Sequence, residues 1–365
     1  MKVVQILPEL VSGGVERGTL EISRALIAAG HDSLVISAGG PMVEQLEQEG
    51  GQHLTLPVHK KNLQSLCQIR ALRRALIEHN VDIIHARSRV PAWIAYLAWK
   101  GMPKDTRPRF MTTFHGFHSV SAYSAIMTKG ERVITVSESV KSHILENYPK
   151  TAPDKLTVIH RGVSDKDYPH GYQPSADSDA TRLRASIQDK YLLTLPGRIT
   201  GWKGGELFLQ VLAELKKQGI PVHGWFAGGT HAKRTKFLEE LQQQASDLGL
   251  TEDISFLGQR SDLKDIMAVS DVVLSLSTKE EAFGRVSLEA LRLGKPVLGF
   301  NHGGVAEQLS ILFPEGSVPP EDLDATVRKL SSWYQQRPTV VAKESPFTLE
   351  HMQQAVLALY HELLG

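Results

Sequence analysis

Strand and helix patterns alternate along almost the whole sequence, and this alternation limits the fold more than any other feature. Short apolar runs predict strands, and most are followed by apolar residues at the spacing of an amphipathic helix. The strands are expected at 2–7, 33–38, 53–58, 81–86, 109–114, 132–137, 155–160, 191–196, 221–227, 254–257, 272–277 and 296–300. The clearest helices are expected at 14–29, 62–79, 138–147, 204–218, 232–248 and 285–294. Such βαβ units predict an α/β fold with parallel, doubly wound sheets.

One polar stretch interrupts the alternation. Asp, Ser, Pro, Gly and Lys crowd into residues 164–190, and this composition is typical of a linker. A chain of 365 residues is also long for one hydrophobic core. We therefore expect two similar α/β domains, 1–165 and 191–347, with a hinge or linker at 166–190.

Charge and composition exclude several classes of protein. The net charge of +1 gives no sign of a nucleic-acid partner. Residues 1–165 carry 20 Lys and Arg against 15 Asp and Glu, which could favour an anionic acceptor or membrane surface or be incidental. Cys67 is the only cysteine, so no disulfide can form within the chain, and we expect its side chain to be buried in a helix. No signal peptide and no apolar run of about 20 residues is found, so a cytoplasmic location is expected.

A pair of glutamates follows the predicted strand at 272–277. Glu281 lies in a turn, and Glu289 lies in the helix that begins after Gly284. Ligands of open α/β sheets bind at the carboxyl ends of the strands, where the free N–H groups of a helix start suit a phosphate. Carboxylates accept hydrogen bonds from sugar hydroxyls, so this stretch suits a phosphorylated sugar ligand. The alternative is an exposed acidic turn before an ordinary amphipathic helix.

A second candidate loop follows the predicted strand at 191–196. Arg198 and Lys203 lie in one loop with several glycines, and together they could clamp a diphosphate. The loop is not a Walker motif, because no Ser or Thr follows the lysine. A solvated basic loop is the alternative.

The first half of the chain offers three candidate features. Gly13 and Gly14 follow the first strand and allow close approach of a ligand, or simply make a tight turn; no dinucleotide fingerprint is present. His115 ends the strand at 109–114, where a ligand contact or a structural hydrogen bond would both fit. Arg87 and Arg89 either receive an anionic acceptor or pair with surface acids.

Two short acidic motifs could in principle hold a divalent cation. They contain Asp165 with Asp167 and Asp177 with Asp179, and both fall in the polar stretch, where a solvated linker is the better interpretation. We therefore expect no metal and no cofactor. A serine-hydrolase elbow is also absent.

Together these motifs resemble the family-4 retaining glycosyltransferases, in which two Rossmann-like domains face each other across a cleft in the GT-B fold. The resemblance covers nearly the whole chain. The segments that carry it are Gly13–Glu16, Phe114–Gly116, Val136–Ser139, Val158–Val163, Gly197-Arg198 with Lys203-Gly204, Glu281 to Glu289 with Phe283-Gly284 between them, and Gly303–Glu307. Arg161 and Ser164 depart from the Asn-Gly-Val-Asp common at that point of the family, which leaves the acceptor contacts of that loop open.

The resemblance implies a role for each candidate residue. Arg198 and Lys203 would hold the donor diphosphate, Glu289 the ribose hydroxyls, Glu281 the transferred sugar, and His115 would lie by the reacting face of that sugar. The implied catalytic residues are thus His115, Glu281, Arg198 and Lys203. The implied donor-binding residues are Gly13, Gly14, Arg198, Lys203, Glu281, Phe283, Gly284, Arg285, Val286 and Glu289. The implied acceptor residues are Arg87, Arg89, Ser137 and Arg161.

The expected function is therefore metal-independent, retaining transfer from a nucleotide-sugar donor to a saccharide or lipid-linked saccharide. The first domain would receive the acceptor, and the helix at 348–365 would pack back on it. His85–Trp93 looks most like members that build bacterial envelope saccharides such as lipopolysaccharide, and weak contact with an anionic membrane would fit. An epimerase, which needs no acceptor, is one alternative. A non-catalytic sugar-nucleotide-binding module is the other, although it would not need the residues of both domains.

Overall fold

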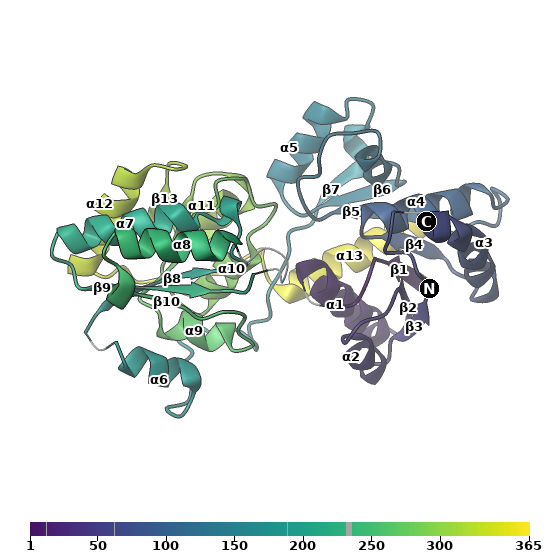
Figure 1. Ribbon diagram of the computed structural model, residues 1–365. Coiled ribbons are helices and arrows are strands. Elements are labelled where there is room, and N and C mark those ends of the chain that lie inside the picture. The colour runs from purple at the N-terminus through teal and green to yellow at the C-terminus, as the bar shows by residue number, and fades with distance from the viewer. Residues whose placement is uncertain (12, 62, 188, 231–235) are drawn as a thin grey trace. The chain divides into compact units, whose positions relative to one another are not determined.

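The chain divides into two compact units. The computed structural model describes all residues except 12, 62, 188 and 231–235 (Figure 1). The first unit comprises Met1–Gly162 together with Phe347–Gly365, and the second comprises Val163–Pro346. Each unit is an α/β layer structure around its own parallel sheet, which confirms the expected fold class.

The sheet of the first unit has seven strands in the order β3-β2-β1-β4-β5-β6-β7, all parallel. The strands are β1 (Lys2–Ile6), β2 (Asp32–Ser37), β3 (Gln52–Thr55), β4 (Ile83–Ala86), β5 (Arg109–Phe114), β6 (Arg132–Thr135) and β7 (Leu156–Val158). The helices are α1 (Gly14–Ala28), α2 (Val43–Gln48), α3 (Leu63–Glu78), α4 (Arg89–Lys100), α5 (Glu138–Asn147) and α13 (Leu349–Leu364), with 3-10 turns η1 (Ser124–Thr128) and η2 (Pro153–Lys155).

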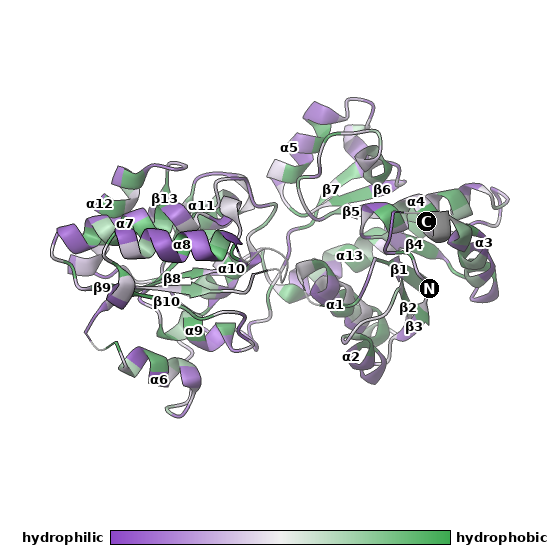
Figure 2. Cartoon of the chain, viewed as in Figure 1, coloured by the Kyte–Doolittle hydropathy of each residue, from purple (hydrophilic) through white to green (hydrophobic). Residues whose placement is uncertain are grey.

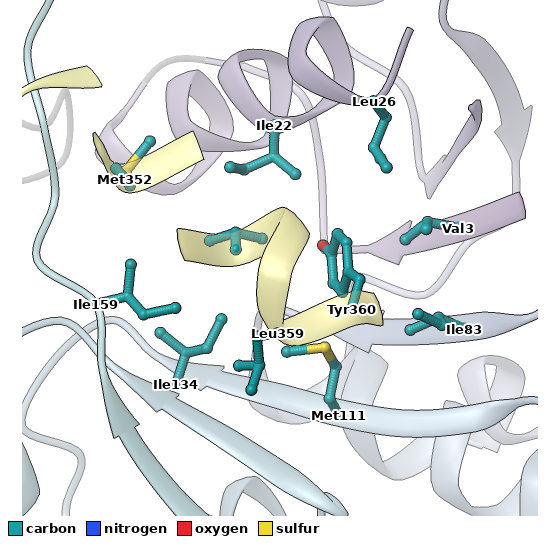
Figure 3. Close-up of a cluster of buried hydrophobic side chains, with 11 residues drawn as sticks. Val3, Ile22, Leu26, Ile83, Met111, Ile134, Ile159, Met352, Leu359 and Tyr360 are labelled. Carbon is teal, nitrogen blue, oxygen red and sulfur yellow. The ribbon is translucent and has the colours of Figure 1, made fainter. Parts of the chain in front are cut away.

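The last helix of the chain, α13, completes the core of the first unit. Its apolar side chains pack with those of α1 and of the central strands in one buried cluster (Figure 3). Tyr360 is fully buried in that cluster, and its hydroxyl lies 2.7 Å from Nδ1 of His85. The Nε2 atom of His85 lies 2.6 Å from the Thr113 hydroxyl, so both ring nitrogens are occupied. Burial therefore places this histidine in a structural role.

The sheet of the second unit has six parallel strands in the order β10-β9-β8-β11-β12-β13. The strands are β8 (Tyr191–Pro196), β9 (Val222–Ala227), β10 (Ile254–Phe256), β11 (Val272–Ser275), β12 (Val297–Phe300) and β13 (Ser317–Val318). The helices are α6 (Asp179–Ala185), α7 (Gly205–Lys217), α8 (Lys236–Asp247), α9 (Leu263–Val269), α10 (Arg285–Arg292), α11 (Gly303–Leu312) and α12 (Leu323–Gln335), with η3 (Gly201–Lys203), η4 (Thr251–Asp253) and η5 (Pro314–Gly316). In Figure 2 the strands are mostly green, whereas α7 and α8 alternate purple with green, as helices do when one face is buried.

The polar stretch at 166–190 differs from the expected linker. It contains α6, whose first turn is capped by the Ser178 hydroxyl, and it belongs to the second unit. Ala180 is fully buried against Leu192 and Trp225. Ala180, with the partly buried Leu183 and Ile187, thus draws this segment into a core that its overall composition does not indicate. Cys67 also differs from expectation, because its side chain on α3 is exposed.

Both sheets reverse their strand order at one point, and these points locate the candidate sites. In the first sheet, β2 and β3 follow on one side of β1, and β4 to β7 follow on its other side. In the second sheet, β9 and β10 lie on one side of β8, and β11 to β13 lie on its other side. At such a switch point the loops after the two central strands diverge and leave a crevice at the carboxyl edge. Gly13 and Arg87 follow β1 and β4, and Lys203 and Glu281 follow β8 and β11.

Candidate active site

A lysine, a glutamate and a serine meet at the switch point of the second unit. The Nζ atom of Lys203 lies 2.7 Å from Oε1 of Glu281, and both side chains are about four-fifths buried. The hydroxyl of Ser277 donates to the same carboxylate oxygen at 2.5 Å. Two loops that are distant in sequence, one after β8 and one after β11, therefore place one cation and one anion side by side, together with a neutral donor.

Two glycines allow the loops to approach this closely. Gly204 adopts a left-handed conformation with φ of 78°, and a Cβ atom there would lie 2.0 Å from the carbonyl oxygen of Leu276. Gly284 has φ of 82°, and its Cβ would lie 2.4 Å from the side chain of Val305. Larger residues would be strained at both positions.

Helix α10 begins directly after Gly284 without a side-chain cap. The first N–H groups of a helix have no intrahelical partner, and the helix dipole adds partial positive charge there. A small pocket is lined by Lys203, Glu281 and Gly284 together with Val286 and Ser287 of the first turn of the helix. The geometry is suited to an anion that brings hydroxyl groups with it.

Helix α11 holds the glutamate turn in place. The N–H of Gly304 donates to the carbonyl oxygen of Glu281 at 2.7 Å. Nε2 of His302 lies 2.9 Å from the carbonyl oxygen of Ser277, and the side-chain amide of Gln308 donates to the carbonyl of Phe283. The site is therefore fixed by backbone contacts before any ligand arrives. Of these supporting residues only the Gly303-Gly304 pair has a sequence signal.

The remaining candidates of the second unit lie differently. Glu289 is 4% exposed and accepts a hydrogen bond from Nε of Arg285 at 3.0 Å. Neither residue is among those that line the pocket. The ring of Phe283 is buried, whereas the Arg198 side chain is exposed and makes no hydrogen bond or ion pair with the residues that the structure describes. The structure thus unites Lys203 with Glu281 and leaves Arg198 and Glu289 apart from them.

Two arginines and a histidine gather at the carboxyl edge of the first unit. Arg161 donates to the carbonyl oxygen of Gly14, and its Nη1 lies 3.4 Å from Nδ1 of His115. Arg87 donates to the amide oxygen of Gln5 at 2.9 Å. A Cβ atom on Gly18 of α1 would touch both guanidinium groups, so this glycine makes room for them.

The charge state of His115 follows from these neighbours. Burial, and then the positive charges of Arg87 and Arg161, lower the pKa of His115 well below its ordinary value, so the ring is neutral near pH 7. Because a guanidinium can only donate, Nδ1 must be the acceptor and Nε2 must carry the proton. Nε2 is buried and has no hydrogen-bond partner among the described residues. It is therefore a donor available to a ligand oxygen.

The other candidates of the first unit have different surroundings. Ser137 is fully buried, and its hydroxyl caps α5 by accepting the N–H of Val140 at 3.1 Å. Arg89 donates to the Ser124 hydroxyl at 3.2 Å and lies over the ring of Tyr123. Gly13 caps α1 with φ of 154°. The structure therefore groups Gly14, Arg87, His115 and Arg161, and it gives Ser137 a structural contact.

The described part of the chain contains neither a cluster of metal-ligating side chains nor a membrane-spanning helix. No group of three or more His, Cys, Asp or Glu side chains in the described ranges could hold a metal ion. Among the helices built from those same residues, none is long and apolar enough to cross a membrane.

Comparison with known proteins places both halves of the chain. The profile of Glycosyltransferase Family 4 matches residues 12–167, and that of Glycosyl transferases group 1 matches residues 179–344. A solved glycosyltransferase from Rickettsia africae is 31% identical, with a TM-score of 0.86 over 100% of this chain and 98% of that one.

Two further proteins are similar at lower identity. The lipopolysaccharide core biosynthesis mannosyltransferase LpcC of Rhizobium leguminosarum is 28% identical over 57% of this chain and 60% of its own length. The structure of Anabaena HepE in complex with UDP-glucose is 20% identical, with a TM-score of 0.77 over 99% of this chain and 100% of that one, which speaks for the fold alone. On the two profile matches and the Rickettsia structure, the chain belongs to the family-4 glycosyltransferases.

Proposed function

We propose that this glycosyltransferase moves a sugar from a nucleotide-sugar donor to a saccharide or lipid-linked saccharide, with retention of the anomeric configuration. The second unit binds the donor, and the first unit binds the acceptor. The observation that carries the proposal is the contact of Lys203, Glu281 and Ser277 beside the uncapped start of α10. This is the combination that a sugar diphosphate needs: donors for the phosphates and a carboxylate for the hydroxyls.

The lysine and the helix start act on the leaving group. As the glycosidic bond breaks, negative charge develops on the departing diphosphate, and fixed donors stabilise it there. Lys203 supplies a full charge, and the start of α10, including the N–H group of Val286, supplies partial charge. Arg198, whose side chain is exposed in the same loop as Lys203, would add a second cation once the diphosphate is bound. In this proposal no metal ion is needed.

The ion pair between Lys203 and Glu281 is exchanged when the donor binds. The lysine turns to the diphosphate, and the carboxylate accepts from hydroxyls of the transferred sugar. The leaving phosphate then takes the proton of the attacking acceptor hydroxyl on the same face of the sugar, which retains the configuration without a covalent intermediate. Glu289 binds the ribose after giving up its contact with Arg285.

The first unit supplies positive charge and one neutral donor. Arg87 and Arg161 suit an acceptor that carries an anionic group, and Nε2–H of His115 donates to an oxygen of the reacting sugar. A role in lipopolysaccharide or other envelope polysaccharide synthesis, at the cytoplasmic side of the membrane, is supported by the similarity to the Rhizobium enzyme. The basic residues Lys60, Lys61, Arg70 and Arg74 are exposed or half-buried and would favour weak contact with an anionic membrane.

A donor screen with two variants tests this function. UDP-, GDP- and ADP-sugars are offered with and without acceptor saccharides, in the presence of a strong chelator, and products are separated. We expect a new glycoside only when an acceptor is present, and the chelator should not reduce its formation. Isomerised donor without an acceptor would instead identify an epimerase, and full dependence on Mn²⁺ or Mg²⁺ would contradict the role of Lys203.

Lys203→Met should lower kcat by about a hundredfold or more, because a fixed donor to the developing charge is lost. Lys279→Met removes a lysine that is exposed in the loop after β11 and should leave kcat unchanged. Equal rates of the two variants would mean that Lys203 does not stabilise the leaving group.

A further inference from the structure

A second pocket of the second unit lies at the opposite edge of the same sheet. It is lined by residues at the amino ends of three strands and by the end of α12, among them Tyr191, Asp271, Lys295, Trp333 and Arg337. We call it the basal pocket. Strand β8 has six residues, so the basal pocket and Lys203 are separated by about 20 Å. It is therefore distinct from the candidate donor site.

Lys295 contributes an ammonium group to the basal pocket. The residue lies between β11 and β12 and is half-buried. Its Nζ atom makes no hydrogen bond or ion pair with the residues that the structure describes, and Asp271 attracts it only from a greater distance. Burial lowers the pKa of Lys295. Partial burial of a cation without a close anion costs free energy that a bound anion would return.

Tyr191 contributes a hydroxyl group. The residue is 1% exposed, and its hydroxyl oxygen is buried without a hydrogen-bond partner among the described residues. Burial raises the pKa of Tyr191, so the hydroxyl keeps its proton and can donate it. A buried tyrosine hydroxyl normally finds a partner, which makes this one informative.

The carboxylate of the basal pocket is already occupied. Oδ2 of Asp271 accepts from the N–H of Leu192 at 2.7 Å and lies 3.4 Å from Nη2 of Arg184. Its Oδ1 contacts Arg337. Asp271 thus pairs with both arginines but carries one negative charge against their two positive charges, and the donors that remain are the ammonium of Lys295 and the hydroxyl of Tyr191. The basal pocket therefore has two donors and a net positive charge, and this combination suits an anionic ligand with several acceptor oxygens.

We propose that the basal pocket binds a phosphate group, either as inorganic phosphate or as a small phosphate monoester. Its oxygens accept from Lys295 and Tyr191, and the half-exposed guanidinium of Arg337 lies at the side of the pocket. The ligand joins the end of α12 to the starts of β8, β11 and β12, so binding stabilises the second unit. This site does not depend on the glycosyltransferase reaction.

Thermal unfolding and calorimetric titration with inorganic phosphate test the proposal. Both are done in the Lys203→Met variant, so that phosphate at the donor site does not contribute, and sodium chloride of equal ionic strength serves as the reference. Glycerol phosphate is titrated in parallel to distinguish a monoester from free phosphate. We expect saturable binding and a rise in the melting temperature, because a ligand of the native state stabilises it.

The Lys295→Met change should abolish that rise, whereas Lys236→Met, in which the replaced side chain is 88% exposed on α8, should preserve it. Tyr191→Phe should change the melting temperature and the phosphate affinity in opposite directions. Without phosphate it should melt at a higher temperature, because an unpaired buried hydroxyl is removed, and its affinity for phosphate should fall about tenfold.

An unchanged phosphate response in Lys295→Met would overturn the proposal, and so would unchanged affinity in Tyr191→Phe. The tyrosine variant keeps the proposal testable if Lys295→Met fails to fold. Because no activity is measured, these results are independent of whether the proposed transfer reaction is correct.

Discussion

The two candidate sites lie at equivalent points of two similar sheets, yet they treat charge differently. In the second unit, two cations are paired with carboxylates, Lys203 with Glu281 and Arg285 with Glu289, and the exposed Arg198 lies apart from them. In the first unit, Arg161 and Arg87 contact neutral oxygens, the carbonyl of Gly14 and the amide of Gln5.

This contrast has a physical consequence. A site whose cation is already neutralised binds an anion by exchange, and the released carboxylate becomes available to a second group of the same ligand. In the first unit the positive charges of Arg87 and Arg161 lower the pKa of His115, so this site keeps a positive potential that attracts an anion directly. The second arrangement suits a sugar diphosphate, which brings both phosphates and hydroxyls, and the first suits an acceptor with one anionic group.

The largest effect should come from the neutral donor of the first unit. His115→Ala should lower kcat by about a hundredfold, because Nε2–H no longer reaches the reacting sugar. The neighbouring His118 is also half-buried and provides the matched control, since His118→Ala should change kcat little. Steady-state kinetics with saturating donor compare the two. Equal kcat values of the two variants would mean that His115 is not a catalytic donor, and the proposed role of the first unit would be wrong.

The next largest effect should be a difference between the two units in how much stability they lose when the pH is lowered. Burial lowers the pKa of His115 and His85 well below 6.5 and that of His118 to about 4, whereas one histidine among the described residues of the second unit is comparable, His223, with a pKa of about 4. Below pH 6.5 the unfolded chain binds more protons than the native one. Each such histidine therefore lowers stability by about 1.4 kcal/mol per pH unit, down to its native pKa.

Between pH 6.5 and 5 the first unit should therefore lose more stability than the second. Hydrogen exchange, corrected for the intrinsic pH dependence of the rate, measures the two units in one sample. Greater loss in the second unit would contradict the histidine account. The depressed carboxyl pKa values of Asp253 and Asp262 belong to the second unit but act only below about pH 4.

The smallest expected effect separates a structural serine from a functional one. Ser137→Ala should cost about 1 kcal/mol of stability, because α5 loses its cap, and should leave the acceptor KM unchanged. Ser277→Ala should do the reverse: it should lower kcat with little change in stability, since its hydroxyl contacts Glu281. Chemical denaturation and kinetics of both variants provide the check. A raised acceptor KM in Ser137→Ala would return this residue to the acceptor site.

Much of the fold follows from short-range pattern. The expected strands at 109–114 and 191–196 agree with β5 and β8 residue for residue, because buried parallel strands form uninterrupted apolar runs. Helix α4 is not among the clearest helices that the sequence predicts, since Pro91 and several aromatic residues obscure its period. The order of the strands cannot be derived from such runs, because it depends on contacts across the whole unit.

The candidate site could be predicted only in part for the same reason. Glycines and charged residues after strands identified Lys203, Glu281 and His115. Arg161 and Gly14 are 147 residues apart in the sequence, and no short-range pattern predicts their contact. In the sequence, Ser277 is the last residue of an apolar run. Only the structure shows that its hydroxyl donates to the carboxylate of Glu281, four positions later. The sequence predicts that Glu289 serves the same ligand as Glu281, yet its carboxylate accepts a hydrogen bond from Arg285.

The two glutamates give the most direct test of the account. Glu281→Gln removes the charge that holds Lys203, so affinity for the nucleoside diphosphate should stay the same or rise, while kcat falls because the sugar contact is weakened at the transition state. Glu289→Gln should instead weaken diphosphate binding by roughly 1.5–3 kcal/mol through the ribose. Calorimetric titration of both variants, paired with steady-state kinetics, measures these terms. If Glu281→Gln turns over normally, or loses nucleotide affinity as severely as Glu289→Gln, the exchange of the Lys203–Glu281 pair is contradicted.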